Sequence, residues 1–261
     1  MEKPILENEI IEAIWTLHPD KSPGPDKFTI NFYRAAWDII KEDLKKMLNW
    51  TRKKDKIGGA TNSTFLALIP KEKNPLSIER FHPISLCNTS YKILTKILAT
   101  RMKKIMAKII SETQGGFIAG RKIMDNIIIV QEAILSSLES KQQGIAINLD
   151  MANSFDRFNH FFLFEIMQKM GFSKNLCRWI KACISSPWIV PLVNGRPASF
   201  FQASRGLCQG CPLSLLLYII VAKYLCKKLQ AMQDNGDLRG LKIARGVKNA
   251  NHANMQMTLS F

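Results

Sequence analysis

The stretch "VNGRPASFFQASRGLCQGCPLS" (193–214) links a strand-like segment to an apolar helix. Its Asn194-Gly195 dipeptide tolerates the positive φ angles of a type I′ turn, so residues 188–204 are predicted to form a β-hairpin. Pro212 suits the first turn of the helix that follows. Between the hairpin and the helix lies "CQGC", a Cys-x-x-Cys sequence whose meaning depends on the rest of the chain.

A Cys-x-x-Cys pair can belong to a zinc site, to a redox dithiol or to neither. A structural zinc site needs further ligands, and the nearest other cysteines, Cys177 and Cys183, have the wrong spacing for a second pair. The cysteines are scattered through a chain without a signal peptide, which is typical of reduced intracellular thiols, in the nucleus or the cytoplasm. We therefore interpret Cys208 and Cys211 as neither ligands nor a redox centre, with zinc or redox chemistry as the lesser alternative.

The composition indicates a globular protein with a polyanionic partner. Hydrophobic residues make up 46% of the 261 residues, which is typical of a chain with a buried core. Lys and Arg outnumber Asp and Glu by 37 to 21, so the net charge is +16. Such an excess favours nucleic acid as the partner, with an unengaged basic surface as the alternative. The longest apolar run, "PLSLLLYIIVA" (212–222), falls short of the roughly 20 residues of a membrane span, so a buried helix is expected.

Hydrophobic periodicity predicts helices mixed with a few strands. Prolines within residues 18–28 end the first helix, since proline cannot continue one. Helices are expected at Glu9–Leu17, 32–48, Tyr91–Ile110, His160–Met170 and Lys174–Ser185, and strands at 63–71 and 144–150. This mixture predicts the α+β class.

The helix expected at 91–110 has one apolar face and one basic face. No acid interrupts the cations of the basic face, which are Lys92, Lys96, Arg101, Lys103, Lys104 and Lys108. A solvated surface is the simpler explanation, but cations without counter-charges suit a phosphate backbone better.

Four stretches carry the strongest functional signal. They are "KSPGPDKFTINFY" (21–33), "LIPKEKNPLSIERFHPISLCNTSYKILTKILATRM" (68–102), "INLDMANSFDRFNH" (147–160) and the opening stretch at 193–214. In this order and spacing they resemble the reverse transcriptases of plant LINE-type (non-LTR) retrotransposons. The resemblance runs from about Glu9 to His252.

The resemblance implies an RNA-directed DNA polymerase that binds an RNA template and a DNA primer, or an RNA–DNA duplex. Residues 1–62 would form a helical extension leading into the fingers, 63–144 the fingers and 145–253 a partial palm. The sequence stops inside the palm, so the thumb of the right-hand polymerase fold is expected to be absent.

The resemblance also implies nucleotidyl transfer by two Mg²⁺ ions, which are hard cations that carboxylates bind. In the family one carboxylate ends a strand, and Asp150 in "NLDMANSFD" matches it. On its own, an Asp at a strand end is more simply a cap or turn residue. Met151 follows it in the nucleotide site. Phe155 matches the aromatic residue that excludes a ribose 2′-hydroxyl, with core packing as the alternative.

Further positions match contacts to nucleotide or nucleic acid. Gln209 and Gly210 match the loop that lies against the incoming nucleotide and the template, and Lys71 belongs to the fingers region whose cations meet the triphosphate. Arg121 is expected to contact nucleic acid along with the basic helix. His82 stands where the family has an Arg, and a His cannot grip a phosphate with a bidentate fork.

The same resemblance explains the Cys-x-x-Cys sequence. Where the family has Arg-Gln-Gly-Asp-Pro-Leu-Ser-Pro, this chain has "CQGCPLSL". Cys208 and Cys211 thus replace an Arg and an Asp inside the nucleotide-binding loop. Asn148 similarly stands where a Lys is usual.

The gravest departure concerns the family's paired Asp residues, which would follow "NHA" (251–253). The chain instead reads "NMQMTLSF" (254–261), and it has no acidic residue after Asp237. Met255 and Met257 are each encoded by ATG, so the shifted reading frame must contain the Ala and the second Asp of Tyr-Ala-Asp-Asp. The Tyr and the first Asp follow if Asn254 is AAT and Gln256 is CAG, as in AAT ATG CAG ATG ACA read from the third base. We infer a one-nucleotide deletion near codon 254 that leaves an out-of-frame tail. An authentic, diverged tail is the alternative.

Three functional hypotheses follow. A polymerase by descent is expected to be inactive, because Asp150 alone cannot hold two dications. A non-catalytic remnant would bind RNA or duplex through its basic surface, with a steep dependence on salt. The third is a pseudogene product without a stable fold, which a cooperative melting transition would distinguish from the second.

Overall fold

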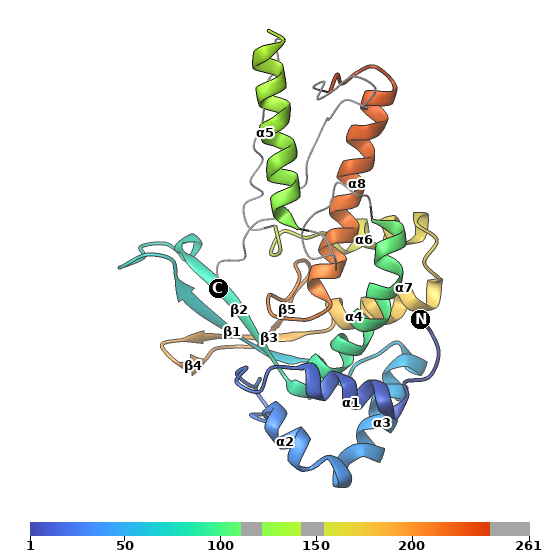
Figure 1. Ribbon diagram of the computed structural model, residues 1–261. Coiled ribbons are helices and arrows are strands. Elements are labelled where there is room, and N and C mark those ends of the chain that lie inside the picture. Colours follow the sequence, from blue (N-terminus) through green and yellow to red (C-terminus); the bar gives the residue numbers. More distant parts are fainter. Residues whose placement is uncertain (111–121, 142–153, 241–261) are drawn as a thin grey trace. The chain divides into compact units, whose positions relative to one another are not determined.

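The computed structural model describes residues 1–110, 122–141 and 154–240 (Figure 1). Helices and one sheet occur together in these ranges, in agreement with the predicted mixture of α and β elements. The strand expected at 144–150 lies outside the described residues.

The chain divides into two compact units. The first consists of Met1–Met102 and Asn153–Leu217, and the second of Lys103–Ala152 and Tyr218–Phe261. The boundaries of fingers and palm that the resemblance implies stay a prediction.

The sheet of the first unit is built around strand β1. Its strands are β1 (Ser63–Pro70), β2 (Phe81–Cys87), β3 (Trp188–Val193), β4 (Arg196–Pro197) and β5 (Phe201–Gln202). β1 runs antiparallel to β2, with Thr64 opposite Cys87, and parallel to β3, with Ser63 opposite Trp188. The strand order is β2-β1-β3-β4, and β5 also pairs with β3. The strand predicted at 63–71 is confirmed.

The predicted hairpin turn is also confirmed. β3 and β4 pair antiparallel, with Val193 opposite Arg196, so Asn194 and Gly195 are the two turn residues. Their φ angles are 50° and 76°, as a type I′ turn requires. The prediction for Pro212 is wrong in detail, because helix α8 begins at Ser214 and Pro212 precedes its first turn.

Most of the predicted helices are present. The first unit holds α1 (Glu7–Thr16), α2 (Ile30–Ala35), α3 (Trp37–Lys54), α6 (His160–Lys169), α7 (Lys174–Ser185) and the 3₁₀ turn η1 (Ile78–Arg80). The second holds α5 (Ile123–Glu139), while α4 (Thr89–Ile109) and α8 (Ser214–Asp234) have residues in both units. No helix within the described ranges is long and apolar enough to cross a membrane.

One predicted helix is in fact two. The segment expected as a single helix at 32–48 is interrupted at Ala36, whose ψ angle is 7°. The Ala36 amide closes α2 by donating to the Phe32 carbonyl at 2.8 Å, and the Ala36 carbonyl accepts from Ile40 at 3.1 Å to open α3. Apolar spacing survives this break, which is why periodicity alone did not reveal it.

The core of the first unit gathers on α4 and α7. Leu94 and Leu98 of α4 and Trp179 and Ile180 of α7 are each at most 1% exposed. The Tyr91 hydroxyl donates a hydrogen bond to the Cys183 carbonyl at 3.0 Å and so ties the two helices together. The predicted apolar face of α4 is therefore confirmed in this part of the helix.

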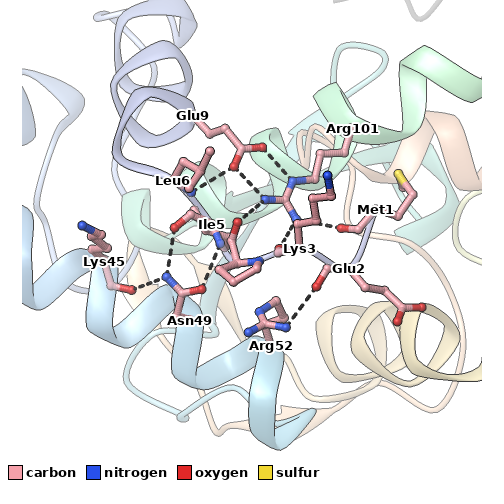
Figure 2. Close-up of polar contacts among 11 residues, drawn as sticks. Met1, Glu2, Lys3, Ile5, Leu6, Glu9, Lys45, Asn49, Arg52 and Arg101 are labelled. Atoms are coloured by element: carbon pink, nitrogen blue, oxygen red, sulfur yellow. Dashed lines mark hydrogen bonds and ion pairs between the residues drawn. The ribbon is translucent and has the colours of Figure 1, made fainter.

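Arg101 is buried, which corrects its predicted role on a basic surface. Its guanidinium forms an ion pair with Glu9, with 2.6 Å between Nη2 and Oε2. It also donates hydrogen bonds to the carbonyl oxygens of Met1, Lys3 and Pro4, at 2.7, 2.8 and 3.0 Å. Figure 2 shows these groups around the guanidinium. Arg101 Nε also donates to Glu9 Oε1 at 2.7 Å, so all five N–H groups of the guanidinium have an acceptor. Arg101 thus binds the N-terminal segment to α4.

Helix α3 holds the same N-terminal segment from another side. The Asn49 side chain accepts a hydrogen bond from the Ile5 amide at 2.9 Å and donates one to the Ile5 carbonyl at 3.1 Å (Figure 2). Arg52 donates to the Glu2 carbonyl at 3.0 Å. Since Ile5 is 1% exposed, the segment is part of the folded unit.

Replacing Arg101 should therefore destabilise the fold. Arg101→Ala leaves Glu9 and three carbonyl groups without their shared donor, and we expect the free energy of unfolding to fall by about 3–5 kcal/mol in urea titrations. Lys104→Ala, at an exposed position of the same helix, should change it by less than about 0.5 kcal/mol. Equal effects of the two variants would contradict a structural role for Arg101.

Candidate functional site

A cleft of about 350 Å³ lies in the first unit beside the sheet. Two loops, residues 155–158 and residues 206–211, contribute to its lining. Its walls are mostly apolar and include Leu66, Leu68, Phe81, Pro83, Ile189 and Phe201. The polar groups at the cleft come chiefly from Ser85, Asp156, Arg205 and Cys208. An apolar cleft with a few polar groups is the usual form of a ligand site.

The two loops are bonded to each other through their backbones. The Gly206 amide donates to the Phe158 carbonyl and the Leu207 amide to the Phe155 carbonyl, both at 2.8 Å. The His160 ring, through Nε2, lies 2.6 Å from the Gly206 carbonyl oxygen. Phe155 is therefore held beside the loop that contains Gln209 and Gly210.

The second loop is also fixed to the edge of the sheet. The Ser85 amide of β2 donates to the Gln209 carbonyl at 3.0 Å. Gly210 has a φ angle of +102°, and a Cβ there would lie 3.2 Å from the Ser85 carbonyl oxygen, so both conformation and space favour glycine. Within the described part of the chain, the side-chain oxygen of Gln209 is buried without a hydrogen-bond partner. This orphaned acceptor is a group that a ligand could satisfy.

Asp156 and Glu79 are the acids that line the cleft, and the sequence analysis missed both. Burial of the Asp156 carboxyl group raises its pKa, while the facing charges of His82 and Lys71 act in the opposite direction. Lys71 itself is held by a hydrogen bond from its amine to the Glu79 carbonyl at 3.1 Å. The signal available in the sequence was the position of Asp156 directly after Phe155.

The cysteines of the loop serve its packing. Cys211 donates a weak hydrogen bond to the Tyr91 hydroxyl at 3.9 Å, and burial raises its pKa. A hydrogen bond with Cys87, followed by burial, holds the pKa of Cys208 well above its ordinary value. Among the residues that the structure describes, no three His, Cys, Asp or Glu side chains gather in a way that could hold a metal ion.

The predicted site residues thus fall into three groups. Those held in the two loops beside the cleft, or near enough to the cleft residue Asp156 to act on its pKa, are Phe155, Gln209, Gly210, Lys71 and His82. Those outside the described residues are Arg121, Asp150 and Met151. The remaining group is the basic face of α4.

The cations of α4 differ in their surroundings. Lys103, Lys104 and Lys108 are exposed, as a contact with phosphate requires. Lys92 is half-buried and donates to the Ser22 carbonyl at 2.7 Å, and burial lowers its pKa. Lys96 is half-buried.

The described residues do not make a magnesium site by themselves. Asp156 lies near the Lys71 cation, which repels a dication. The carboxylate predicted to bind magnesium, Asp150, lies outside the described residues, so its role stays a prediction.

The raised pKa of Asp156 predicts a pH-dependent effect on stability. The folded state holds this proton more tightly than the unfolded state, so the contribution of Asp156 is most favourable below a pH of about 3.9 and is lost as the pH rises through the folded-state pKa. Asp156→Asn should raise the melting temperature at pH 7 and leave it nearly unchanged at pH 3. Asp43→Asn, at an exposed carboxylate of α3, serves as the control. A melting temperature of Asp156→Asn that drops at pH 7 would contradict the shift.

Comparisons with known proteins show which family the chain belongs to. The family described as "Reverse transcriptase (RNA-dependent DNA polymerase)" matches residues 69–244, more than half of the chain. An uncharacterized 149 kDa protein of transposon TX1 from Xenopus laevis is 29% identical over 227 residues, covering 87% of this chain and 17% of the relative. The Pol polyprotein of the type-2 retrotransposable element R2DM from Drosophila melanogaster is 25% identical over 232 residues, covering 88% and 21%.

The RNA-directed DNA polymerase of the mobile element jockey from Drosophila melanogaster is 24% identical over 217 residues, covering 82% of this chain and 24% of the relative. This chain therefore spans about a fifth of the length of these curated relatives. The family match includes β1 from Ile69, all of β2, and the loop at 206–211. The chain belongs to the reverse transcriptase family, and it resembles the reverse transcriptases of non-LTR retrotransposons.

Proposed function

We propose that this chain is the nucleotide- and template-binding part of a non-LTR retrotransposon reverse transcriptase, and that in its present sequence it binds nucleic acid without polymerising. One observation carries the proposal. The loop at 206–211 is bonded to β2 on one side and to residues 155–158 on the other. Phe155, Gln209 and Gly210, which match the family's nucleotide site, therefore lie in segments that line one cleft through their neighbours Asp156, Leu207 and Cys208.

The roles proposed for the chain's residues follow from their match to the family pattern and from their positions in the segments beside this cleft. Phe155, Gln209 and Gly210 would border the nucleotide, and the orphaned oxygen of Gln209 would accept a hydrogen bond from it. Lys71 would meet the phosphates as a point charge. His82 would add charge only when protonated, so it supplies less than the Arg of the family pattern.

Catalysis is expected to fail for lack of carboxylates. Magnesium, when bound, would activate a primer 3′-oxygen and hold the triphosphate. Asp150, with Met151 beside it, would offer one carboxylate, but residues 254–258 occupy the position of the family's Asp pair and contain none. A tail read out of frame explains this sequence.

The absence of polymerisation can be tested directly. We expect no primer extension on an RNA template with Mg²⁺ and four deoxynucleotides, under conditions in which an active reverse transcriptase extends the same primer. Template-dependent extension that Asp150→Ala abolishes would overturn the proposal of inactivity.

Binding to an RNA–DNA duplex is the activity expected to remain. With a net charge of +16, the chain should bind more weakly as salt is raised, because counterions released from phosphates drive the association. The exposed cations Lys103, Lys104 and Lys108 are the proposed contacts on α4. Binding by a cooperatively folding chain would also set aside an unfolded pseudogene product.

A triple Ala variant at Lys103, Lys104 and Lys108 should make the slope of log K against log salt shallower. The change should be about 0.9 for each lysine that contacts a duplex phosphate. The matched control replaces Lys41, Lys46 and Lys169 by Ala, because each of these already pairs with a neighbouring carboxylate. Fluorescence anisotropy between about 50 and 200 mM salt measures both variants. The same slope in both would show that charge alone, and not α4, determines binding.

A further inference from the structure

The first unit presents two aromatic rings side by side on its surface. The ring centroids of Phe28 and Phe32 are 4.5 Å apart with an interplanar angle of 32°, and the two residues are 45% and 40% exposed. The buried Tyr33 meets Phe32 edge-on, with centroids 5.6 Å apart. The pair therefore has a supported inner side and an outer side in contact with water.

The loop that carries Phe28 is fixed to the start of α4. The Thr89 hydroxyl donates to the Phe28 carbonyl at 2.6 Å, and the Asn88 side-chain oxygen accepts from the Asp26 amide at 3.1 Å. Gly24 lies so close that a Cβ there would come within 2.4 Å of the Asn88 backbone nitrogen. The ring is thus positioned before any ligand arrives, which lowers the entropy cost of binding.

Cations lie on the loop that carries Phe28 and on the helix to which this loop is bonded. Lys21 and Lys27 are exposed on the same loop. The Lys92 amine reaches the loop from α4 and bonds to the Ser22 carbonyl at 2.7 Å. Lys21 is near enough to Lys92 to lower the Lys92 pKa further, after the larger effect of burial.

The two acids of the loop interact with groups other than Lys27. The Asp26 carboxylate accepts a hydrogen bond from the Phe28 amide at 3.1 Å, and burial raises its pKa. Asp20 is exposed and lies 3.6 Å from a ring nitrogen of His18. Lys27, adjacent to Phe28, has no such carboxylate among the ion pairs of the described residues.

We infer that Phe28 and Phe32 form a stacking platform for the bases of single-stranded nucleic acid, with Lys21 and Lys27 as contacts for the adjoining phosphates. Exposed rings beside cations are how proteins hold single strands without reading their sequence. A duplex would not use the rings, because its bases are already stacked on one another. The inference rests on the proposed function and adds to it a place where an unpaired strand binds.

The test compares single-stranded and duplex binding in ring variants of the whole chain. The probes are a fluorescein-labelled 20-nucleotide single-stranded RNA of mixed sequence and a blunt RNA–DNA duplex of the same length. Phe28→Ala with Phe32→Ala should weaken binding of the single strand about 10-fold or more and leave duplex binding within about 2-fold. The salt slope should not change, because no phosphate contact is lost.

Three further variants separate stacking from other effects. Phe28→Trp should retain single-strand affinity, since indole also stacks, whereas Phe28→Leu should lose it while keeping an apolar side chain. Ile39→Ala, at a residue 85% exposed on α3, is the matched control for loss of surface apolar area and should bind as the parent does. Lys27→Ala should make the single-strand salt slope shallower by about 0.7. Melting temperatures check that each variant is folded. If the double Ala variant is unfolded, Phe28→Leu takes its place in the test.

The outcomes are distinguishable. If the parent binds both probes and the ring variants bind the single strand equally well, the platform is refuted and the proposed function stands. If the parent binds neither probe, the proposed function fails as well. If the ring variants lose single strand and duplex alike, the rings are not a stacking site. If the ring variants bind both probes as the parent does but differ from it in the molar mass measured by light scattering, the surface is a protein interface and the inference is wrong.

Discussion

The candidate site depends on one backbone hydrogen bond, from the Ser85 amide to the Gln209 carbonyl. Because β2 is an edge strand of the sheet, an outward-facing amide is available to a segment that is not itself a strand. This bond places the loop at 206–211 on the sheet, and the bonds from Gly206 and Leu207 then place residues 155–158 on the loop. These three segments supply part of the cleft wall, including Ser85, Asp156 and Leu207, so a displaced loop would remove that part.

Local patterns in the sequence predicted local structure well. The turn at Asn194-Gly195 and the helices near 160–170 and 174–185 depend on residues that are neighbours in the chain, and all three are present. Arg101 was misplaced for the opposite reason. Helical periodicity shows that a cation lies opposite the apolar face of its own helix, but it does not show whether another segment buries that cation. The groups that bury Arg101 lie 92–100 residues away in sequence. The split of α2 from α3 escaped notice because apolar spacing continues across Ala36.

The candidate site was predictable only through resemblance to a family. No periodicity brings Lys71, His82 and Phe155 together; their proximity arises from strand pairing and from loop bonds between distant segments. Asp156 was overlooked because a carboxylate next to a motif residue has no distinctive pattern until the cations facing it are known. The Cys-x-x-Cys pair shows the opposite error, in which a local pattern suggests a site. Its spacing suggests a metal site, but the Cys208 thiol forms a hydrogen bond with Cys87 and the Cys211 thiol forms one with Tyr91.

The close approach of Gly24 to Asn88 affects how a gene of this kind can drift. Every missense change of a glycine codon adds a β-carbon, or a proline ring, and here the new atom would meet backbone, which no rotamer change can relieve. The loop would have to leave α4 as a whole and give up its bonds to Asn88 and Thr89 together. Among copies of such an element that accumulate mutations, those that keep Gly24 would keep this region folded, and those that replace it would not. This holds whether or not the copies keep their catalytic acids.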